Sequence, residues 1–287
     1  MSAAGMSPEL VLINGEPAGG AGVSPLDRGL HYGDGLFETI ACRGGRARFL
    51  SLHLERLAAG CQRLRIPFAG VDVLRREINE AVCGIEPALL KLIVTRGEAR
   101  ARGYGLSGTE APVRLLMRYG WPPDSSSAQV EGARVRVANL RLGENPALAG
   151  MKHLNRLEQV LARAEAPVEE AAELLLFSSS GRLVCGTMSN VFVVHGGRVT
   201  TPRLDLCGVA GVMRKVVLRE AGKAGIVTEE GDVSPAELDG ATEVFLTNAR
   251  IGIWPVCRIG DRPLAPGDVT RRLQALIAPM LENPVDA

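Results

Sequence analysis

The first half of the chain combines short apolar runs with one strongly amphipathic stretch. Apolar residues recur at the spacing of a single helix face, at Leu54, Leu57, Ala58, Cys61 and Leu64. Ser51 precedes this stretch and predicts an N-cap, because its hydroxyl can accept a hydrogen bond from an amide of the first turn. A second helix is expected at 71–82, and strands are expected at 10–13, 36–41, 88–95 and 113–118.

The second half also mixes helix and strand patterns. From Leu154 onward, apolar residues recur at Leu157, Val160, Leu161 and Ala164, which predicts an amphipathic helix that ends before Pro167. Strands are expected at 135–140, 173–177, 191–194, 198–201, 243–247 and 254–258. Further helices are expected at 212–221, 234–237 and 268–281, of which the second opens with a capping-box pattern and a proline.

The segment Trp-Pro-Pro-Asp-Ser-Ser-Ser at 121–127 is rich in turn-forming residues and predicts a linker. A length of 287 residues favours two domains over one. We therefore expect a loose N-terminus at 1–9, a small α/β domain at 10–120 and a larger domain at 128–287. The fold class is α/β in the broad sense, with helices and strands contributing to both cores.

Composition narrows the class of protein. An apolar content of 46% with 23% charged residues is typical of a soluble globular protein. A net charge of +1 argues against a nucleic-acid binder, which needs a concentrated basic surface. No apolar run is long enough to span a bilayer and no signal-peptide pattern opens the chain, so a cytoplasmic protein is expected. The cysteines lack metal-binding spacing, so we expect neither a metal site nor a disulfide framework; they are Cys42, Cys61, Cys83, Cys185, Cys207 and Cys257.

Lys152 is the most informative residue, because it stands where a polar loop turns into the amphipathic helix. A lysine in such a place can enter a cleft and attack carbonyl groups, and a covalently held pyridoxal phosphate is the commonest use of such a residue. The loop Gly208–Gly211 runs into the helix expected at Val212, where backbone amides and the helix dipole favour an anion. A surface lysine and a plain glycine connection are the alternatives for these two features.

The stretch AGMKHLNRLEQ at 149–159 resembles the segment around the cofactor lysine of aminodeoxychorismate lyases, which are fold-type IV pyridoxal phosphate enzymes. The resemblance spans nearly the whole chain from about Leu10, and includes 27–39, 53–57, 95–97, 102–104, 189–192, 201–202, 208–214 and 245–248. It implies a two-domain fold with a small N-terminal α/β domain, a larger C-terminal pseudo-barrel domain and a cleft between them. It also implies a homodimer that binds pyridoxal 5'-phosphate.

The resemblance also assigns cofactor-binding residues. Lys152 corresponds to the imine-forming lysine and Arg56 to the phosphate-binding arginine. The backbone at 211–213 corresponds to the rest of the phosphate site, through Gly211, Val212 and Met213. Asn190 and Asn248 are further candidates for contacts with the cofactor. For Arg56, which lies on the polar flank of its expected helix, the alternative is a solvated arginine.

Position 185 departs from the family pattern. Most members carry a glutamate five residues before the asparagine of the Ser-Asn pair, where it contacts the pyridine nitrogen, and this chain has Cys185 there. A neutral thiol is a poor substitute for a carboxylate, so ordinary transaminase chemistry is in doubt. Three interpretations stay open: a weaker electron sink suffices, another group serves the nitrogen, or the protein has lost catalysis.

Substrate-side residues come from the same resemblance. Arg102 and Tyr104 correspond to a loop that faces the substrate pocket, and His31 stands beside a turn that borders the active site. Arg96, Arg100 or Arg102 could pair with a carboxylate of a dianionic substrate. D-amino-acid transaminases have a histidine where Tyr104 stands, which disfavours that substrate class.

The function that these features predict is the conversion of 4-amino-4-deoxychorismate to 4-aminobenzoate and pyruvate, a step of folate biosynthesis, with Lys152 as covalent anchor and acid-base group. The substrate is thus a small chorismate-derived anion. The nearest alternative is a class-IV aminotransferase that acts on branched-chain or D-amino acids. A non-catalytic homologue that binds the cofactor is the second alternative.

Overall fold

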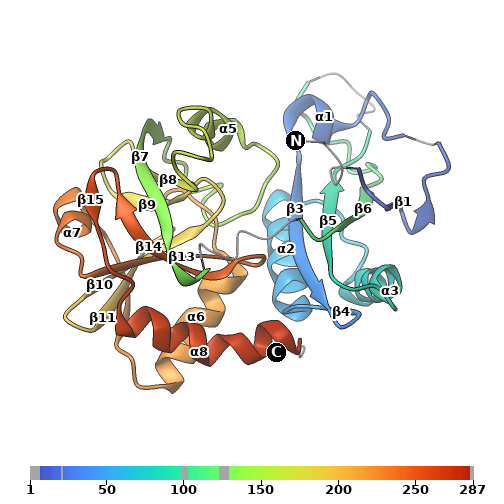
Figure 1. Ribbon diagram of the computed structural model, residues 1–287. Helices are drawn as coiled ribbons and strands as arrows, with labels where there is room; N and C mark the ends of the chain where they lie inside the picture. Colours follow the sequence, from blue (N-terminus) through green and yellow to red (C-terminus); the bar gives the residue numbers. More distant parts are fainter. Residues whose placement is uncertain (1–6, 21, 99–102, 123–128, 285–287) are drawn as a thin grey trace. The chain divides into compact units, whose positions relative to one another are not determined.

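The computed structural model describes residues 7–20, 22–98, 103–122 and 129–284, and it divides the chain into two compact units (Figure 1). The first unit comprises 1–123, 152–155 and 280–287, and the second comprises 124–151 and 156–279. The short segment Lys152–Asn155 therefore belongs to the first unit, although the residues on either side of it belong to the second. Most of the linker expected at 121–127 and most of the N-terminus expected to be loose lie outside the described residues.

The first unit is built on a six-stranded antiparallel sheet in the order β2-β1-β6-β5-β3-β4. Its strands are β1 (Leu10–Ile13), β2 (Glu16–Pro17), β3 (Gly35–Arg43), β4 (Arg46–Ala47), β5 (Ala88–Thr95) and β6 (Val113–Gly120). Its helices are α1 (Arg28–Tyr32), α2 (Leu50–Leu64) and α3 (Val71–Val82). The core forms where α2 and α3 cover one face of the sheet, and its buried side chains include Ile40, Leu54, Leu57, Leu74, Ile78, Leu90 and Leu92.

The start of α2 differs from the sequence prediction. The helix begins at Leu50, and its N-cap is Phe49 in the left-handed region at φ 53°, with no side-chain cap. The Ser51 hydroxyl instead accepts a hydrogen bond from Nη2 of Arg75 at 2.9 Å. The Phe49 ring is 1% exposed, and burying an aromatic ring contributes more free energy than a side-chain cap. The predicted Ser51 cap was therefore wrong.

The second unit is built on a nine-stranded mixed sheet in the order β12-β11-β10-β13-β14-β7-β8-β9, with β15 paired to β14. Its strands are β7 (Ala133–Leu142), β8 (Glu173–Ser178), β9 (Leu183–Gly186), β10 (Asn190–His195), β11 (Arg198–Pro202), β12 (Thr228–Gly231), β13 (Glu243–Asn248), β14 (Gly252–Ile259) and β15 (Arg262–Pro263). Strand β7 runs parallel to both of its neighbours, whereas β10, β13 and β14 form an antiparallel set. The remaining helices are α5 (Leu157–Arg163), α6 (Val212–Lys223), α7 (Pro235–Asp239) and α8 (Asp268–Glu282).

The core of the second unit contains a stacked pair of rings, Phe192 and Phe245, with centroids 4.7 Å apart. They lie on neighbouring strands, β10 and β13, which pair directly at these two residues.

Each of the two units combines a β-sheet with helices, which confirms the expected α/β class. Within the described ranges, no helix is long and apolar enough to cross a membrane. The same ranges contain no cluster of three or more histidine, cysteine, aspartate or glutamate residues arranged to hold a metal ion.

Helix α5 carries its apolar face on the outside. It begins at Leu157, three residues later than the apolar pattern from Leu154 predicts, because Leu154 pairs with β3 instead. Leu157 is 75% exposed, and Val160 and Leu161 are each 60% exposed. Only Ala162 of this helix is buried. The helix therefore presents to solvent an apolar surface that soluble proteins usually cover.

Candidate active site

The backbone around Lys152 is fixed to the first strand of the site, β3. The amide of Phe37 donates to the carbonyl of Lys152 at 3.0 Å, and the amide of Leu154 donates to the carbonyl of Gly35 at 3.0 Å. His153 forms an isolated antiparallel bridge with Leu36 between these two bonds. Paired backbone on both sides of a residue holds its side chain in a reproducible direction. Lys152 is thus a positioned lysine, as the sequence predicts.

The side chain of Lys152 lies on an aromatic ring. Its Nζ is 4.2 Å from the centroid of the Phe37 ring. Nζ of Lys91 on β5 is 5.7 Å from the same centroid. Lys91 is paired in register with Thr39, so Phe37, Thr39 and Lys91 share one face of the sheet. Two positive charges at one ring make this face attractive to anions.

A buried carboxylate stands on the opposite face of β3, next to Phe37. Glu38 is 1% exposed and accepts hydrogen bonds from Nδ1 of His53 at 2.7 Å and from Nε of Arg56 at 2.8 Å. Nη2 of Arg56 also donates to Glu38. Burial alone would raise the pKa of Glu38, but the Arg56 guanidinium and the His53 imidazole outweigh it and lower the pKa to about 2. Glu38 is therefore ionised at neutral pH.

His53 completes this network as a neutral group. Burial lowers the pKa of His53, and the positive charges of Arg56 and Lys152 lower it further, although Glu38 opposes the shift. A neutral imidazole that donates through Nδ1 keeps a lone pair on Nε2. That Nε2 is buried and has no hydrogen-bond partner in the described structure. Arg56 was expected from sequence to lie on the polar flank of its helix, but Glu38 fixes it and leaves its side chain only 15% exposed.

In the second unit, the N-terminus of α6 offers a backbone site for an anion. Gly211 is the N-cap, and no side chain caps the first turn of this helix. The Asn190 side chain accepts from the amide of Gly211 at 3.1 Å and donates to the carbonyl of Val209 at 2.9 Å. A Cβ at position 211 would lie 2.0 Å from Oδ1 of Asn190, so only glycine fits there. The first turn of α6 could therefore bind an anion through its amides, and the phosphate contacts of Val212 and Met213 stay a prediction.

Thr247 adds a hydroxyl that the sequence analysis missed. It is the last residue but one of β13 and pairs with Asn190; it is 1% exposed, and its Oγ1 has no partner among the described residues. A buried hydroxyl without a partner costs free energy, so a ligand that satisfies it is stabilised there. A threonine in a strand is ordinarily a β-forming residue, and the sequence pattern therefore carried no signal for this role.

Asn248, beside Thr247, is engaged in shaping its own turn. Its Oδ1 accepts from the amides of Arg250 at 3.0 Å and Ile251 at 2.9 Å, and its Nδ2 donates to the carbonyl of Met188 at 3.2 Å. The predicted cofactor contact of Asn248 stays a prediction. The geometry gives this asparagine a role in holding the 248–251 turn next to the Thr247 hydroxyl.

Cys185 lies in β9 and is 6% exposed within an apolar cluster. Burial raises the pKa of its thiol strongly, and the negative charge of Glu173 raises it further, whereas Arg156 opposes the shift. The thiol is therefore neutral across the physiological range. Whatever group faces Cys185 meets a weak hydrogen-bond partner with no negative charge.

Glu173 is the nearby carboxylate that could have taken over from a glutamate at position 185, and its oxygens are already engaged. Oε1 accepts from the amide of Thr187 at 2.9 Å and from the Thr187 hydroxyl. Oε2 accepts from the amide of Met188 at 3.1 Å and from the hydroxyl of Ser189 at 2.9 Å. This carboxylate holds the 186–189 turn in place, so it is not the group that replaces the missing glutamate.

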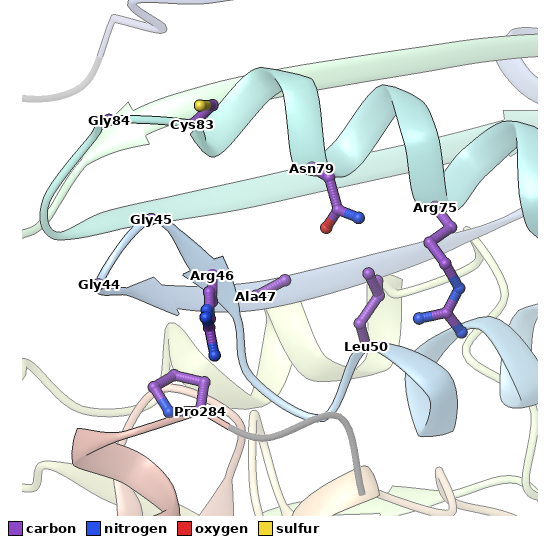
Figure 2. Close-up of a pocket in the computed structure, with 10 residues that line it drawn as sticks. All are labelled: Gly44, Gly45, Arg46, Ala47, Leu50, Arg75, Asn79, Cys83, Gly84 and Pro284. Carbon is purple, nitrogen blue, oxygen red and sulfur yellow. The ribbon is translucent and has the colours of Figure 1, made fainter.

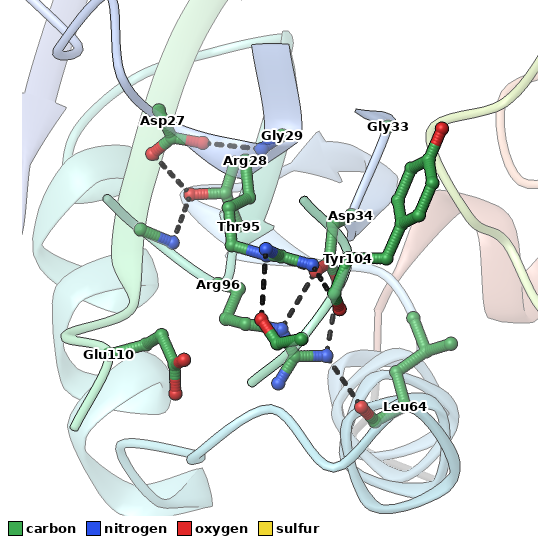
Figure 3. A network of polar contacts seen from close by, with 12 residues as sticks. Asp27, Arg28, Gly29, Gly33, Asp34, Leu64, Thr95, Arg96, Tyr104 and Glu110 are labelled. Carbon is green, nitrogen blue, oxygen red and sulfur yellow. Dashed lines mark hydrogen bonds and ion pairs between the residues drawn. The ribbon is translucent and has the colours of Figure 1, made fainter. Parts of the chain in front are cut away.

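The predicted substrate residues differ in how well they are placed. His31 is exposed, and its Nε2 lies 2.7 Å from the carbonyl of Pro25. Tyr104 is 82% exposed, and Arg100 and Arg102 lie outside the described residues. Arg96 is 4% exposed and donates to Asp34 and to carbonyls at the end of α2, so it belongs to the framework and does not face a substrate (Figure 3).

A separate hollow of about 490 Å³ lies at the other end of β3 (Figure 2). Its lining includes Arg46, Arg75, Asn79 and Cys83, between the β3–β4 turn and helix α3. Strand β3 rises about 3.4 Å per residue, which separates this turn from Phe37 by roughly 20 Å. Lys152 is not among the lining residues, so the hollow is not the site that the sequence motifs define.

Comparison with known proteins identifies the family of the chain. A profile of the amino-transferase class IV family matches residues 35–259, and the chain belongs to this family. Within it, the chain is 37% identical over 254 residues to the aminodeoxychorismate lyase of Vibrio harveyi, which covers 86% of this chain and 93% of that one. The 4-amino-4-deoxychorismate lyase structure from Pseudomonas aeruginosa superposes with a TM-score of 0.91 at 44% identity, covering 96% of this chain and all of that one. The D-alanine aminotransferase of Listeria innocua is 28% identical over 254 residues, 86% of each chain.

Proposed function

We propose that this protein is a pyridoxal phosphate-dependent lyase that converts 4-amino-4-deoxychorismate to 4-aminobenzoate and pyruvate. The observation that carries the proposal is its similarity, at 37% and 44% identity over nearly whole chains, to proteins named for this reaction. Relatives named as aminotransferases are less similar, with identities of 30% and 28%. The reaction also needs a lysine that binds the cofactor, and Lys152 is held in a defined position over the Phe37 ring.

The residues present fit pyridoxal phosphate. In the first unit, Lys152 would hold its carbonyl carbon, and Arg56 is a candidate for binding its phosphate. In the second unit, the amides at the start of α6 and the Thr247 hydroxyl are candidates for binding the phosphate. The Thr247 hydroxyl has no hydrogen-bond partner among the described residues, and no side chain caps the first turn of α6, so a phosphate group could accept hydrogen bonds from both. When bound through Lys152, pyridoxal phosphate supplies an electron sink that acidifies the C–H bond next to the substrate nitrogen.

The residues of the protein then transfer protons and attract the charged substrate. The Lys152 amine takes the proton from C4 of the substrate, the bond from C3 to the enolpyruvyl oxygen breaks, and a proton from the lysine converts the departing enolpyruvate to pyruvate. The ring that remains is aromatic, which supplies driving force that an amino transfer lacks. The Lys91 ammonium group beside Phe37 favours a substrate that carries carboxylates.

Cys185 bears on the choice between lyase and aminotransferase. Its neutral thiol would leave the pyridine nitrogen without the carboxylate that most of the family provides. An elimination that ends in an aromatic ring tolerates this weaker electron sink better than an amino transfer does. The structure leaves Glu173 no capacity to substitute, which favours the interpretation that a weak sink suffices.

Replacing Cys185 by glutamate is therefore expected to change lyase turnover by less than about tenfold, a barrier change below about 1.4 kcal/mol. The measurement is the initial rate of 4-aminobenzoate formation by Cys185→Glu and by the matched neutral variant Cys185→Gln. Similar rates for both variants support the proposal. A gain of a hundredfold in Cys185→Glu alone would show that the thiol limits the chemistry.

The decisive test of function is to mix the cofactor-loaded protein with 4-amino-4-deoxychorismate and follow both products together. Equal, catalytic formation of 4-aminobenzoate and pyruvate is the expected result. If neither product forms, a screen of branched-chain and D-amino acids with a keto acid acceptor distinguishes the two alternatives. Amino transfer would identify an aminotransferase, and its absence would leave a protein that binds the cofactor without turnover.

We further propose that the protein is a homodimer and that the outer face of α5 lies in the interface. Leu157, Val160 and Leu161 support this, because they expose a contiguous apolar strip that a second copy would cover. We expect the double variant Leu157→Asp/Leu161→Asp to shift the protein to a monomer in sedimentation velocity. Val227→Asp, at another exposed apolar position in the same unit, is the matched control and should stay dimeric. A monomeric wild-type protein, or a dimeric double variant, contradicts the proposed interface.

A further inference from the structure

Arg28 holds three consecutive backbone carbonyls of the segment that carries Tyr104. Its Nη1 donates to the carbonyls of Gly103 at 3.2 Å and Gly105 at 3.4 Å. Its Nη2 donates to the carbonyl of Tyr104 at 3.2 Å (Figure 3). Arg28 itself is 4% exposed. One buried side chain therefore fixes the backbone of a segment whose own side chain, Tyr104, is 82% exposed.

The glycines on either side of Tyr104 leave this segment open on its outer side. Gly103 adopts φ 92°, and a Cβ on either Gly103 or Gly105 would meet nothing within 4 Å. Neither glycine lies in a helix or strand. The Tyr104 ring contacts the Tyr32 ring at a centroid distance of 5.2 Å. The guanidinium of Arg28 lies 5.0 Å from the centroid of that same Tyr32 ring, so Arg28 contributes to both contacts of the segment.

Arg28 is in turn fixed by a chain of charged contacts that ends on α2. Its Nε donates to Oδ2 of Asp34 at 2.9 Å, and Nε of Arg96 donates to the same oxygen at 2.8 Å. Arg96 also donates to the carbonyls of Leu64 and Arg65, both at 2.7 Å. Burial alone would raise the pKa of Asp34, but Arg96 and Arg28 lower it below its usual value. The carboxylate is therefore ionised and links the two guanidinium groups at neutral pH.

We propose that Arg28 is a positioning residue that sets substrate specificity by holding Tyr104 in place. Its guanidinium acts through the backbone of 103–105 and does not touch the substrate. This inference rests on the proposed function, because Tyr104 is a substrate contact only within that function. Arginine suits the task because its planar fork reaches several acceptors at once, which a lysine ammonium cannot do from the same place.

The test compares Arg28→Lys, Tyr104→Ala and the double variant in the cofactor-loaded protein. Arg28→Lys keeps a positive charge beside Asp34 but loses the fork. We expect KM for 4-amino-4-deoxychorismate to rise about 10- to 100-fold with kcat nearly unchanged, since losing a contact that is equally strong in the bound substrate and the transition state raises KM alone. The absorbance of the lysine-bound cofactor should not change. If Arg28 acts through Tyr104, the double variant should have the same KM as Tyr104→Ala alone.

Hydrogen exchange gives a readout that does not depend on activity. The amides of the peptide covering 103–110 should exchange faster in Arg28→Lys than in the wild type, while peptides from α3 keep the wild-type rate. Additive effects on KM, or unchanged exchange at 103–110, overturn the proposal. If the wild-type protein forms no 4-aminobenzoate, the proposed function fails, and hydrogen exchange alone still decides whether Arg28 holds the segment.

Discussion

Lys152→Ala is expected to abolish both the covalent attachment of pyridoxal phosphate and lyase turnover. The variant lacks the amine that anchors the cofactor and moves the C4 proton, and loss of a positioned acid-base group alone lowers rates on the order of 10²- to 10⁴-fold. The fold should survive, because the backbone bonds of Lys152 to Phe37 and of Leu154 to Gly35 do not involve the side chain. Absorbance spectra of the purified variant with added cofactor provide the measurement.

The small number of lysines in the chain allows a complete test of this prediction. It contains only four lysines, Lys91, Lys152, Lys215 and Lys223, so every alternative anchor can be tested. Lys223→Ala is the matched control, because this side chain is exposed at the end of α6 and pairs with Glu220. Lys223→Ala should keep the spectrum and the turnover of the wild type. Persistence of the cofactor absorbance in Lys152→Ala would show that the assignment of the anchor is wrong.

Chemical trapping can locate the anchor directly. Borohydride reduction of the loaded protein makes the lysine attachment permanent, and trypsin does not cleave after a modified lysine. The modified peptide should then run from Leu142 to Arg156 with Lys152 uncut. A modified peptide containing Lys91 would assign the anchor to the second ammonium group beside Phe37.

Sequence reasoning proposed candidate site residues where local motifs carry the signal. Lys152 stands at a turn between a polar loop and a helix, and the structure pairs that turn with β3. Gly211 was identified by a glycine-bearing loop before a helix, and the structure places α6 directly after it. Both signals are short-range, so the residues that carry them lie next to each other in the printed sequence.

Residues whose partners lie far away in the sequence gave no such signal. Glu38 is separated from His53 and Arg56 by 15 and 18 residues, and their contact depends on how α2 packs against β3. Thr247 meets Asn190 only through the register of β10 with β13. These pairings are set by tertiary packing, which periodicity within one segment cannot reveal.

The apolar pattern of α5 shows a second limit of sequence-based prediction: it identified the helix but not the surroundings of its apolar face. The spacing of Leu157, Val160 and Leu161 correctly predicted an amphipathic helix, yet this face is exposed. Periodicity reports that a helix has an apolar side, but it does not report which surface covers that side. An interface with a second copy would produce the same spacing as a buried core.

Glu38→Gln is expected to lower the free energy of unfolding of the first unit by about 3 kcal/mol at pH 7, because removing one partner leaves buried charge uncompensated. The Arg56 guanidinium would lose a buried carboxylate, and the His53 imidazole would lose its only charged acceptor. Urea unfolding followed by the fluorescence of Trp121 measures this effect, since Trp121 lies in the same unit. A Trp254→Phe background removes the tryptophan of the second unit. Glu80→Gln, at an exposed position of α3, is the matched control and should change stability little.

The pH dependence of this difference tests its electrostatic origin. The pKa of Glu38 falls from its usual value of 4.5 to about 2 on folding, so the ionised carboxylate contributes its full stability above about pH 4.5. That contribution decreases as the pH falls from 4.5 towards 2, because protonation then becomes favourable in the unfolded chain first. The difference between wild type and Glu38→Gln should therefore be constant near pH 7 and shrink across this acidic range. A difference that persists unchanged down to pH 3 would mean that Glu38 stabilises the fold by packing, and that its charge does not hold Arg56 in place.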